Sequence, residues 1–294
     1  MRRWILFFIG FYVRRFPFPF RGQKYLLRLL NYFHLLDHAF IKKTKAGFLM
    51  KLGNVDHIEK ELFCYGTYEE KEGYMFMNFV TQDSTVLDIG ANIGLYSLLA
   101  AHKEKKCTVY AFEPSAHTFE KLRYNIQLNQ YKHILPVHAA AGNRTEQLRL
   151  HLSSEQNSCM TGFKAAENAT GNTELINVLP IDTFTREHNL QTVSLVKIDV
   201  EGFELQVLEG MKSLLSTCRP IVAIEISSET LGRFGQTPQR LFDFFEERNY
   251  NAYEVASENS LQRITHAKDC NLAFFVPAQK QLPAGVSVIE VELA

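Results

Sequence analysis

The stretch from Val86 to Leu99, VLDIGANIGLYSLL, constrains the fold more than any other part of this chain. A short apolar run ends in Asp88, a turn with two glycines follows, and an amphipathic segment comes next. This order is typical of a β-strand, a tight loop and an α-helix in an open α/β sheet. We expect Gly90 to allow a close approach to the backbone, and Gly94 to shape the loop. The stretch therefore predicts a unit that holds a small molecule against backbone groups.

The acid at position 88 narrows the class of that molecule. In dinucleotide-binding fingerprints a glycine occupies this place, because the pyrophosphate approaches the N-terminus of the helix. A carboxylate repels that anion, which argues against a nucleotide-dependent oxidoreductase. It attracts a ligand that carries an ammonium and a sulfonium group, and S-adenosyl-L-methionine fits this description.

A second strand that ends in an acid is predicted from Val109 to Glu113 (VYAFE). Pro114 then favours the start of a helix, where a missing N–H costs nothing, and the helix should run to about Leu128. Parallel neighbouring strands place Asp88 and Glu113 at one carboxyl edge, where open α/β sheets bind ligands. We expect Glu113 to accept hydrogen bonds from two ribose hydroxyls. The alternative is an ordinary βαβ unit whose acids only cap turns.

A third segment contains KIDVEGFE, from Lys197 to Glu204. With DIGANIG, from Asp88 to Gly94, it resembles the FkbM family of S-adenosylmethionine-dependent methyltransferases, marked by D-x-G-A-N-x-G and K-x-D-x-E-G-x-E. The resemblance extends from about Tyr68 to about Val276. It implies an α/β fold, a Rossmann-like seven-stranded class I methyltransferase sheet, with S-adenosyl-L-methionine as cofactor. It also implies methyl transfer, usually to a hydroxyl oxygen.

Two acids in this third segment are the candidate catalytic residues. A hydroxyl is a poor acid, so a base must accept its proton during the transfer. Asp199 ends the fourth strand beside the expected methyl position, and Glu201 lies in the turn that follows. Their proximity can raise one pKa, which suits a base, and the sequence leaves open which of the two it is. In the alternatives, Asp199 orients the methionine amino group or caps a helix, and Glu201 fixes the loop.

The same two acids could also bind a divalent metal, with Glu225 as a third oxygen ligand. Glu225 is an acid inside the apolar strand IEIS, so burial would require a partner for it, and an acceptor-binding role is equally open. Nothing in the sequence favours the metal strongly, and our prediction contains no metal site.

Further cofactor contacts follow from the family resemblance. Tyr68 and Glu69 match an aromatic–acid pair before the first strand, and Glu69 could reach the methionine end of the cofactor or simply begin a helix. The family places adenine contacts after the third strand, where Asn143 is the nearest polar candidate. The predicted cofactor-binding residues are Glu69, Asp88, Gly90, Asn92, Gly94, Glu113, Asn143 and Asp199.

The remaining segments predict the domain organisation. We expect residues 1–65 to form an N-terminal extension, with an aromatic-basic segment, a helix and a small hairpin, and residues 66–294 to form the FkbM-type domain. The predicted helix runs from Lys24 to Phe40, and the hairpin pairs Leu52–Val55 with Ile58–Phe63. A β insertion flanks a polar loop, residues 154–172, which could close over the acceptor. The last two strands, Asn251–Val255 and Leu272–Val276, should be antiparallel.

Composition limits the partners and the compartment. The formal net charge is zero, so a nucleic-acid partner is not expected. Five scattered cysteines, never paired as CxxC, favour a reducing, cytoplasmic location. The segment from Met1 to Arg15 is too short to span a bilayer; it packs on the domain or makes a weak peripheral membrane contact through residues 1–20.

These observations predict an O-methyltransferase that acts on a hydroxyl of a saccharide or natural-product acceptor, with a role in polysaccharide biosynthesis. The alternative is a non-catalytic module of the same fold that binds S-adenosyl-L-methionine. The oligomeric state is not predicted.

Overall fold

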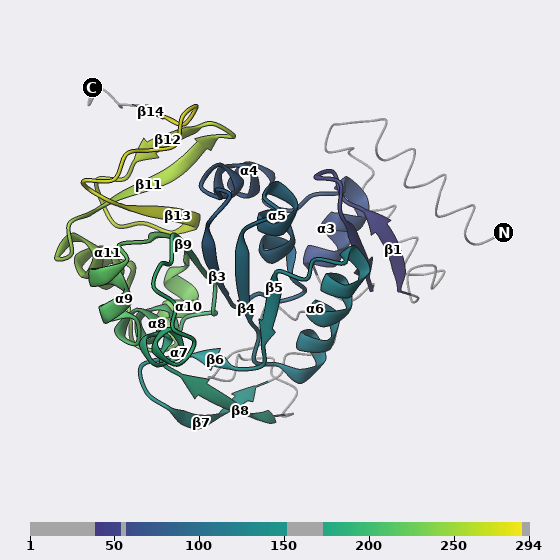
Figure 1. The fold of residues 1–294 in the computed structure, drawn as a ribbon. Coiled ribbons are helices and arrows are strands. Elements are labelled where there is room, and N and C mark those ends of the chain that lie inside the picture. Colours follow the sequence, from purple (N-terminus) through teal and green to yellow (C-terminus); the bar gives the residue numbers. More distant parts are fainter. Residues whose placement is uncertain (1–38, 54–56, 152–172, 290–294) are drawn as a thin grey trace.

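A nine-stranded, mostly parallel sheet forms the centre of this computed structural model, which describes residues 39–53, 57–151 and 173–289. The strand order is β14-β12-β11-β13-β10-β9-β3-β4-β5 (Figure 1). The parallel part runs from β10 to β5, and β13 pairs antiparallel with β10 and β11. The strands are β3 (Thr85–Ile89), β4 (Thr108–Phe112), β5 (Ile134–Val137), β9 (Leu195–Ile198), β10 (Ile221–Ile226), β11 (Tyr250–Ser257), β12 (Ser260–Arg263), β13 (Cys270–Pro277) and β14 (Ser287–Ile289).

Alternating side chains of the central strands bury both faces of the sheet, as expected for parallel strands. Val86 of β3 joins one hydrophobic cluster, whereas Leu87 and Ile89 join the other. The first cluster includes α3 (His57–Tyr65), α4 (Glu70–Asn78), α5 (Leu95–Lys103) and α6 (Ala116–Asn129). The second includes α7 (Ile181–Glu187), α8 (Glu204–Glu209), α9 (Lys212–Thr217), α10 (Ser228–Gly232) and α11 (Pro238–Glu246).

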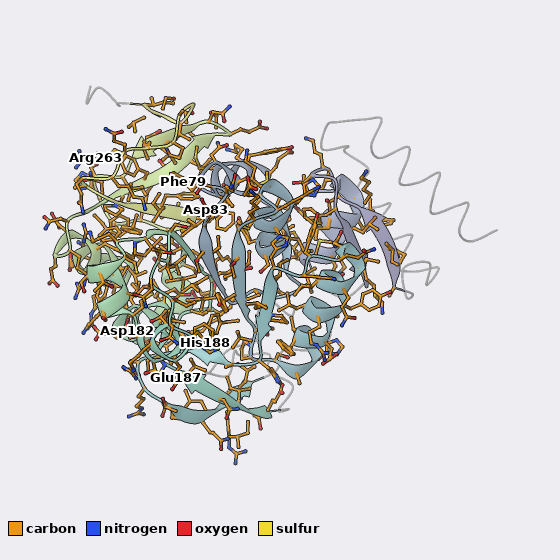
Figure 2. All side chains as sticks on the ribbon, viewed as in Figure 1. Phe79, Asp83, Asp182, Glu187, His188 and Arg263 are labelled. Carbon is orange, nitrogen blue, oxygen red and sulfur yellow. The ribbon has the colours of Figure 1, made fainter. Side chains whose placement is uncertain are left out.

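The order of the parallel strands shows where the sheet reverses its direction of growth. The chain runs from β3 to β4 and β5 on one side and continues with β9 and β10 on the other, so the order reverses between β3 and β9. Asp83, which precedes β3, lies toward the upper part of the view in Figure 2. A small sheet with the order β6-β8-β7 lies at the bottom in Figure 1. Its strands are β6 (Ala140–Ala141), β7 (Glu146–His151) and β8 (Thr173–Leu179).

Most of the predicted elements are confirmed, including the β insertion and the antiparallel final strands. The seven-stranded count is wrong, because β12 and β14 extend the sheet beyond β11. The predicted hairpin is also wrong: the hairpin consists of β1 (Phe40–Lys43) and β2 (Leu49–Leu52), and residues 57–65 form α3. Glu59, Leu62 and Phe63 are buried at helical spacing, which is the pattern of a helix that packs one face against the domain.

Two side chains of α6 hold the hairpin against the domain. The Asn125 Oδ1 atom accepts a hydrogen bond from the Lys51 backbone N–H at 2.8 Å. Asn129 accepts from the Leu49 N–H at 2.8 Å and donates to the Leu49 carbonyl at 2.7 Å. Met50 and Leu52 are fully buried in the first hydrophobic cluster. The division at residues 65 and 66 stays a prediction.

Some predicted segments lie outside the described residues. These are Met1–Arg15, the loop over residues 154–172 and the predicted helix up to residue 38; Phe40, its expected last residue, begins β1. Within the described ranges, no helix has the length and apolar character needed to cross a bilayer.

Candidate active site

A cavity lies at the carboxyl ends of β3, β4, β9 and β10, where the strand order reverses. This is the position where open α/β sheets bind ligands. Five acidic residues from four separate segments of the chain line it, together with apolar residues of α3 and β6. The acids are Glu69, Glu113, Asp199, Glu201 and Glu225; Gly90, Asn92, Ile58, Tyr68, Ala140 and Leu150 also line the cavity.

The loop after β3 brings its backbone against the end of β9. Gly90 has a φ of 79°, and a Cβ atom there would lie 1.8 Å from the carbonyl oxygen of Asp199. Only glycine can therefore occupy this position without moving the backbone. Asn92 also has a left-handed backbone, with a φ of 49°, and its buried Oδ1 atom has no hydrogen-bond partner among the described residues. An orphaned acceptor in this cavity is suited to a ligand that donates a hydrogen bond.

Glu113 follows β4, and two backbone groups orient its carboxylate. The Asn92 N–H donates to Oε2 at 3.0 Å, and the Ser115 N–H donates to Oε1 at 2.9 Å. Burial raises the pKa of Glu113 to about 7, although these two hydrogen bonds oppose the change. Each oxygen retains a further lone pair, so the group can accept two more hydrogen bonds from a ligand.

Glu69 precedes α4 with a φ of 46°, and its carboxylate points toward α5. The Tyr96 hydroxyl donates to Glu69 Oε2 at 2.8 Å. Burial and the neighbouring Asp199 charge raise the pKa of Glu69 to about 7. A bound cation would favour the ionised form of this group.

Asp199 lies directly after β9 and forms an ion pair with Lys197. The Lys197 Nζ atom is 2.9 Å from Asp199 Oδ2. Burial by itself would raise the pKa of Asp199, but the Lys197 charge and hydrogen bonds from Glu225 and Lys197 hold it below its ordinary value. Glu225 shows the opposite behaviour, because burial, the Asp199 charge and their shared hydrogen bond raise its pKa to about 11. The pair therefore favours the ionised form of Asp199 and the protonated form of Glu225.

Glu201 occupies the turn between β9 and α8 with a φ of 55°. The Glu204 Oε1 atom fixes this turn by accepting from the N–H groups of Gly202 at 3.0 Å and Val200 at 3.3 Å. Burial and the charges of Asp199 and Glu204 raise the pKa of Glu201 to about 8. Glu201 thus has the higher proton affinity of the two predicted catalytic acids, a property that suits a general base near neutral pH.

Three of the predicted cofactor-binding residues do not line the cavity. Asp88 is fully buried, and its Oδ2 atom accepts a hydrogen bond from Ser97 of α5 at 2.6 Å. Gly94 begins α5, and a Cβ atom there would lie 2.7 Å from Leu122. Asn143 is exposed beyond β6. Asp88 and Gly94 therefore lie behind the residues that line the cavity, and the contact of Asn143 with adenine stays a prediction.

Two residues in the site had no role in the prediction. Lys197 was only part of a motif, although a lysine within the apolar strand LVKI must have a charged partner when it is buried. That signal was present in the sequence. Ile58 lines the cavity because α3 packs over it, and no local pattern indicates this long-range contact.

One carboxylate oxygen from each of Asp199, Glu201 and Glu225 lies within 4.8 Å of the others. Three such oxygens are suitable ligands for a hard divalent cation. Lys197 already pairs with one of these carboxylates, that of Asp199. The arrangement as it stands suits proton transfer and the binding of an organic cation.

Comparisons with known proteins find one matching family model and several relatives that are named methyltransferases. The model of the methyltransferase FkbM domain matches residues 88–252. "Methyltransferase 1" of Beauveria bassiana is 27% identical over 176 residues, which cover 53% of this chain and 67% of that protein. The hexuronic acid methyltransferase AglP of Haloferax volcanii is 26% identical over 145 residues, 49% of this chain. The match spans only 56% of the length of AglP.

Among solved structures, the chain is similar to methyltransferase FkbM from Methylobacillus flagellatus KT. The TM-score is 0.42 and the sequence identity is 19%; the match covers 66% of this chain and 44% of that one.

Proposed function

The chain belongs to the FkbM methyltransferase family, and we propose that it transfers a methyl group from S-adenosyl-L-methionine to a hydroxyl oxygen of a saccharide or natural product. One observation carries the proposal: five carboxyl groups surround a single cavity at the reversal point of the sheet. Such a site attracts a cationic cofactor and contains groups that can accept a proton.

The residues around the cavity fit the cofactor chemically. Glu113, oriented by two backbone N–H groups, would accept hydrogen bonds from the ribose hydroxyls. Glu69 and Asp199 would attract the ammonium group of the methionine end. The orphaned Asn92 Oδ1 atom would accept a further hydrogen bond. When bound, S-adenosyl-L-methionine supplies a methyl group activated by a positively charged sulfur.

Glu201 is the residue that we assign as the base. Its pKa of about 8 makes it a stronger proton acceptor than Asp199, whose pKa is held below its ordinary value. Glu201 would accept the proton of the acceptor hydroxyl as that oxygen gains the methyl group. Asp199, already paired with Lys197, would contribute a fixed negative charge beside the cofactor. The left-handed backbone at Glu201 is consistent with this role, because such strain concentrates at functional sites.

The acceptor is proposed to be a small molecule or a glycan. The zero net charge gives no general attraction for nucleic acid. AglP is by name a hexuronic acid methyltransferase, and it supports a sugar acceptor as the first class to test. Ile58 and Tyr68, which precede β3 in the chain, also line the cavity, and they would contact the acceptor.

The first experiment measures cofactor binding by calorimetry, with S-adenosyl-L-methionine and S-adenosyl-L-homocysteine. We expect the Glu113→Ala variant to bind both ligands about tenfold to a hundredfold more weakly, because one charge-assisted hydrogen bond contributes about 1.5–3 kcal/mol. The matched control is Glu120→Ala, since Glu120 lies on α6 and forms a surface ion pair with Arg123.

Absence of binding to a well-folded wild-type protein would overturn the proposed function. Equal affinities for the Glu113→Ala variant and the wild type would remove Glu113 from the cofactor site. Once binding is established, a panel of neutral and acidic sugars with a labelled methyl donor would identify the acceptor class.

A further inference from the structure

Lys197 is a buried cation at the centre of the site. Its side chain is 5% exposed, and it lies in β9 between the buried residues Val196 and Ile198. Its Nζ atom is 2.9 Å from Asp199 Oδ2 and 3.4 Å from the carbonyl oxygen of Gly90. The same atom lies 5.1 Å from the centre of the Tyr96 ring. These contacts satisfy the ammonium group on several sides, as a buried charge requires.

The register of the sheet connects Lys197 to the first motif as well. Asp88 of β3 is directly opposite Lys197 of β9, and both side chains are on the face covered by α5. The ammonium group therefore lies between the loop after β3 and the acid after β9. These are the two chain segments that meet at the cavity.

We propose that Lys197 is a positioning residue, which holds the charged Asp199 carboxylate in the orientation that cofactor binding requires. The inference rests on the proposed function, because it assigns the cofactor as the group that Asp199 faces. Lys197 does not line the cavity, so it acts through Asp199 and makes no contact of its own with the ligand.

The charges around the pair support this role. Burial lowers the pKa of Lys197, but the charges of Asp199 and Asp88 outweigh burial and raise it above the ordinary value. Without the ammonium group, the Asp199 carboxylate would lose its ion-pair partner, and its pKa would rise. The charged and titratable groups around this pair are Asp88 of β3, Glu69 before α4, Tyr96 of α5, Glu113 after β4, Glu201 and Glu204 after β9, Glu225 of β10, and Arg233, which acts on Glu201.

The experiment is a double-mutant cycle with Lys197→Met, Asp199→Asn and the combined variant. Calorimetry measures the dissociation constant of S-adenosyl-L-homocysteine between pH 6 and 8.5, and thermal unfolding checks the fold. We expect Lys197→Met to bind at least tenfold more weakly at pH 6. This loss should shrink as the pH rises, because the Asp199 carboxyl group of the variant then ionises. The control is Lys212→Met, whose ammonium group forms a surface ion pair with Glu209.

The combined variant tests whether Lys197 acts through Asp199. We expect it to bind as Asp199→Asn does, with no further loss. A further loss, or a Lys197→Met defect that does not change with pH, would overturn the proposal. If Lys197→Met fails to fold because the buried Asp88 also loses its cation, the cycle is repeated with Asp88→Asn added to every variant. In that background the affinity of the combined variant relative to Asp199→Asn decides the question, and failure of the combined variant to fold there would also overturn the proposal.

The same experiment can also contradict the proposed function, and that outcome differs from the one that contradicts the role of Lys197. If folded wild-type protein and Lys212→Met do not bind S-adenosyl-L-homocysteine, the cofactor assignment itself is wrong. If both bind and Lys197→Met binds equally well at every pH, only the role of Lys197 is wrong.

Discussion

Replacement of Glu201 by glutamine is expected to lower kcat by about 10²- to 10⁴-fold, the usual contribution of a general base. The affinity for S-adenosyl-L-homocysteine should stay close to that of the wild type, because glutamine retains the size of the side chain and Asp199 retains its charge. Methyl transfer to the identified acceptor, followed with a labelled methyl group, measures the rate. Glu209→Gln is the matched control, since Glu209 of α8 is an exposed partner of Lys212.

The pH dependence of the wild type provides an independent check of this role. A base acts in its deprotonated form, and the pKa of Glu201 is raised to about 8. The wild-type rate should therefore increase as pH rises toward 8 and level off above it, and this increase should be absent from the Glu201→Gln variant. A variant that keeps both the rate and the pH profile of the wild type would assign the proton transfer to another group, with Asp199 the first to test.

Replacement of Gly90 by alanine is the second change for which we expect a large effect. The new Cβ atom would lie 1.8 Å from the Asp199 carbonyl oxygen, so the loop after β3 and the end of β9 would have to separate. The positive φ and the steric overlap together should lower the free energy of unfolding by about 2–5 kcal/mol. Binding of S-adenosyl-L-homocysteine should be lost, because the displaced segments carry both Asn92 and Asp199.

Gly235→Ala is a matched control for this prediction. Gly235 also has a positive φ, of 68°, but a Cβ atom there would meet nothing within 4 Å. This variant should lose only about 1–2 kcal/mol of stability, the conformational cost alone, and should bind the ligand normally. Urea denaturation and calorimetry measure both properties. Equal losses of stability in the two variants would show that the contact between the β3 loop and β9 contributes nothing.

Local sequence patterns were sufficient to predict the strands whose ends form the site. Asp88, Glu113 and Asp199 each follow or end an apolar run, and parallel strands bring such ends to one edge. The structure confirms that edge, and the cavity lies there. Glu225 was recognisable for a different reason, since an acid inside an apolar strand needs a partner, and it is hydrogen-bonded to Asp199.

Other features depended on contacts between distant segments. The segment over Ile58–Phe63 has apolar residues compatible with a strand, and its burial under the domain selects a helix instead. β12 and β14 are short strands at one end of the sheet, and their sequences contain no strong alternation that would distinguish them from loops.

By itself, the sequence determined the family, the order of the central elements and the acids at the strand ends, because these depend on local periodicity and on short motifs. Only the tertiary structure decided the charge state of those acids. Desolvation and neighbouring charges hold the pKa of Asp199 below its ordinary value and raise the pKa values of Glu201 and Glu225 above theirs. Three carboxyl groups of nearly equal intrinsic acidity thus acquire different roles, because each one meets different neighbours when the strands come together.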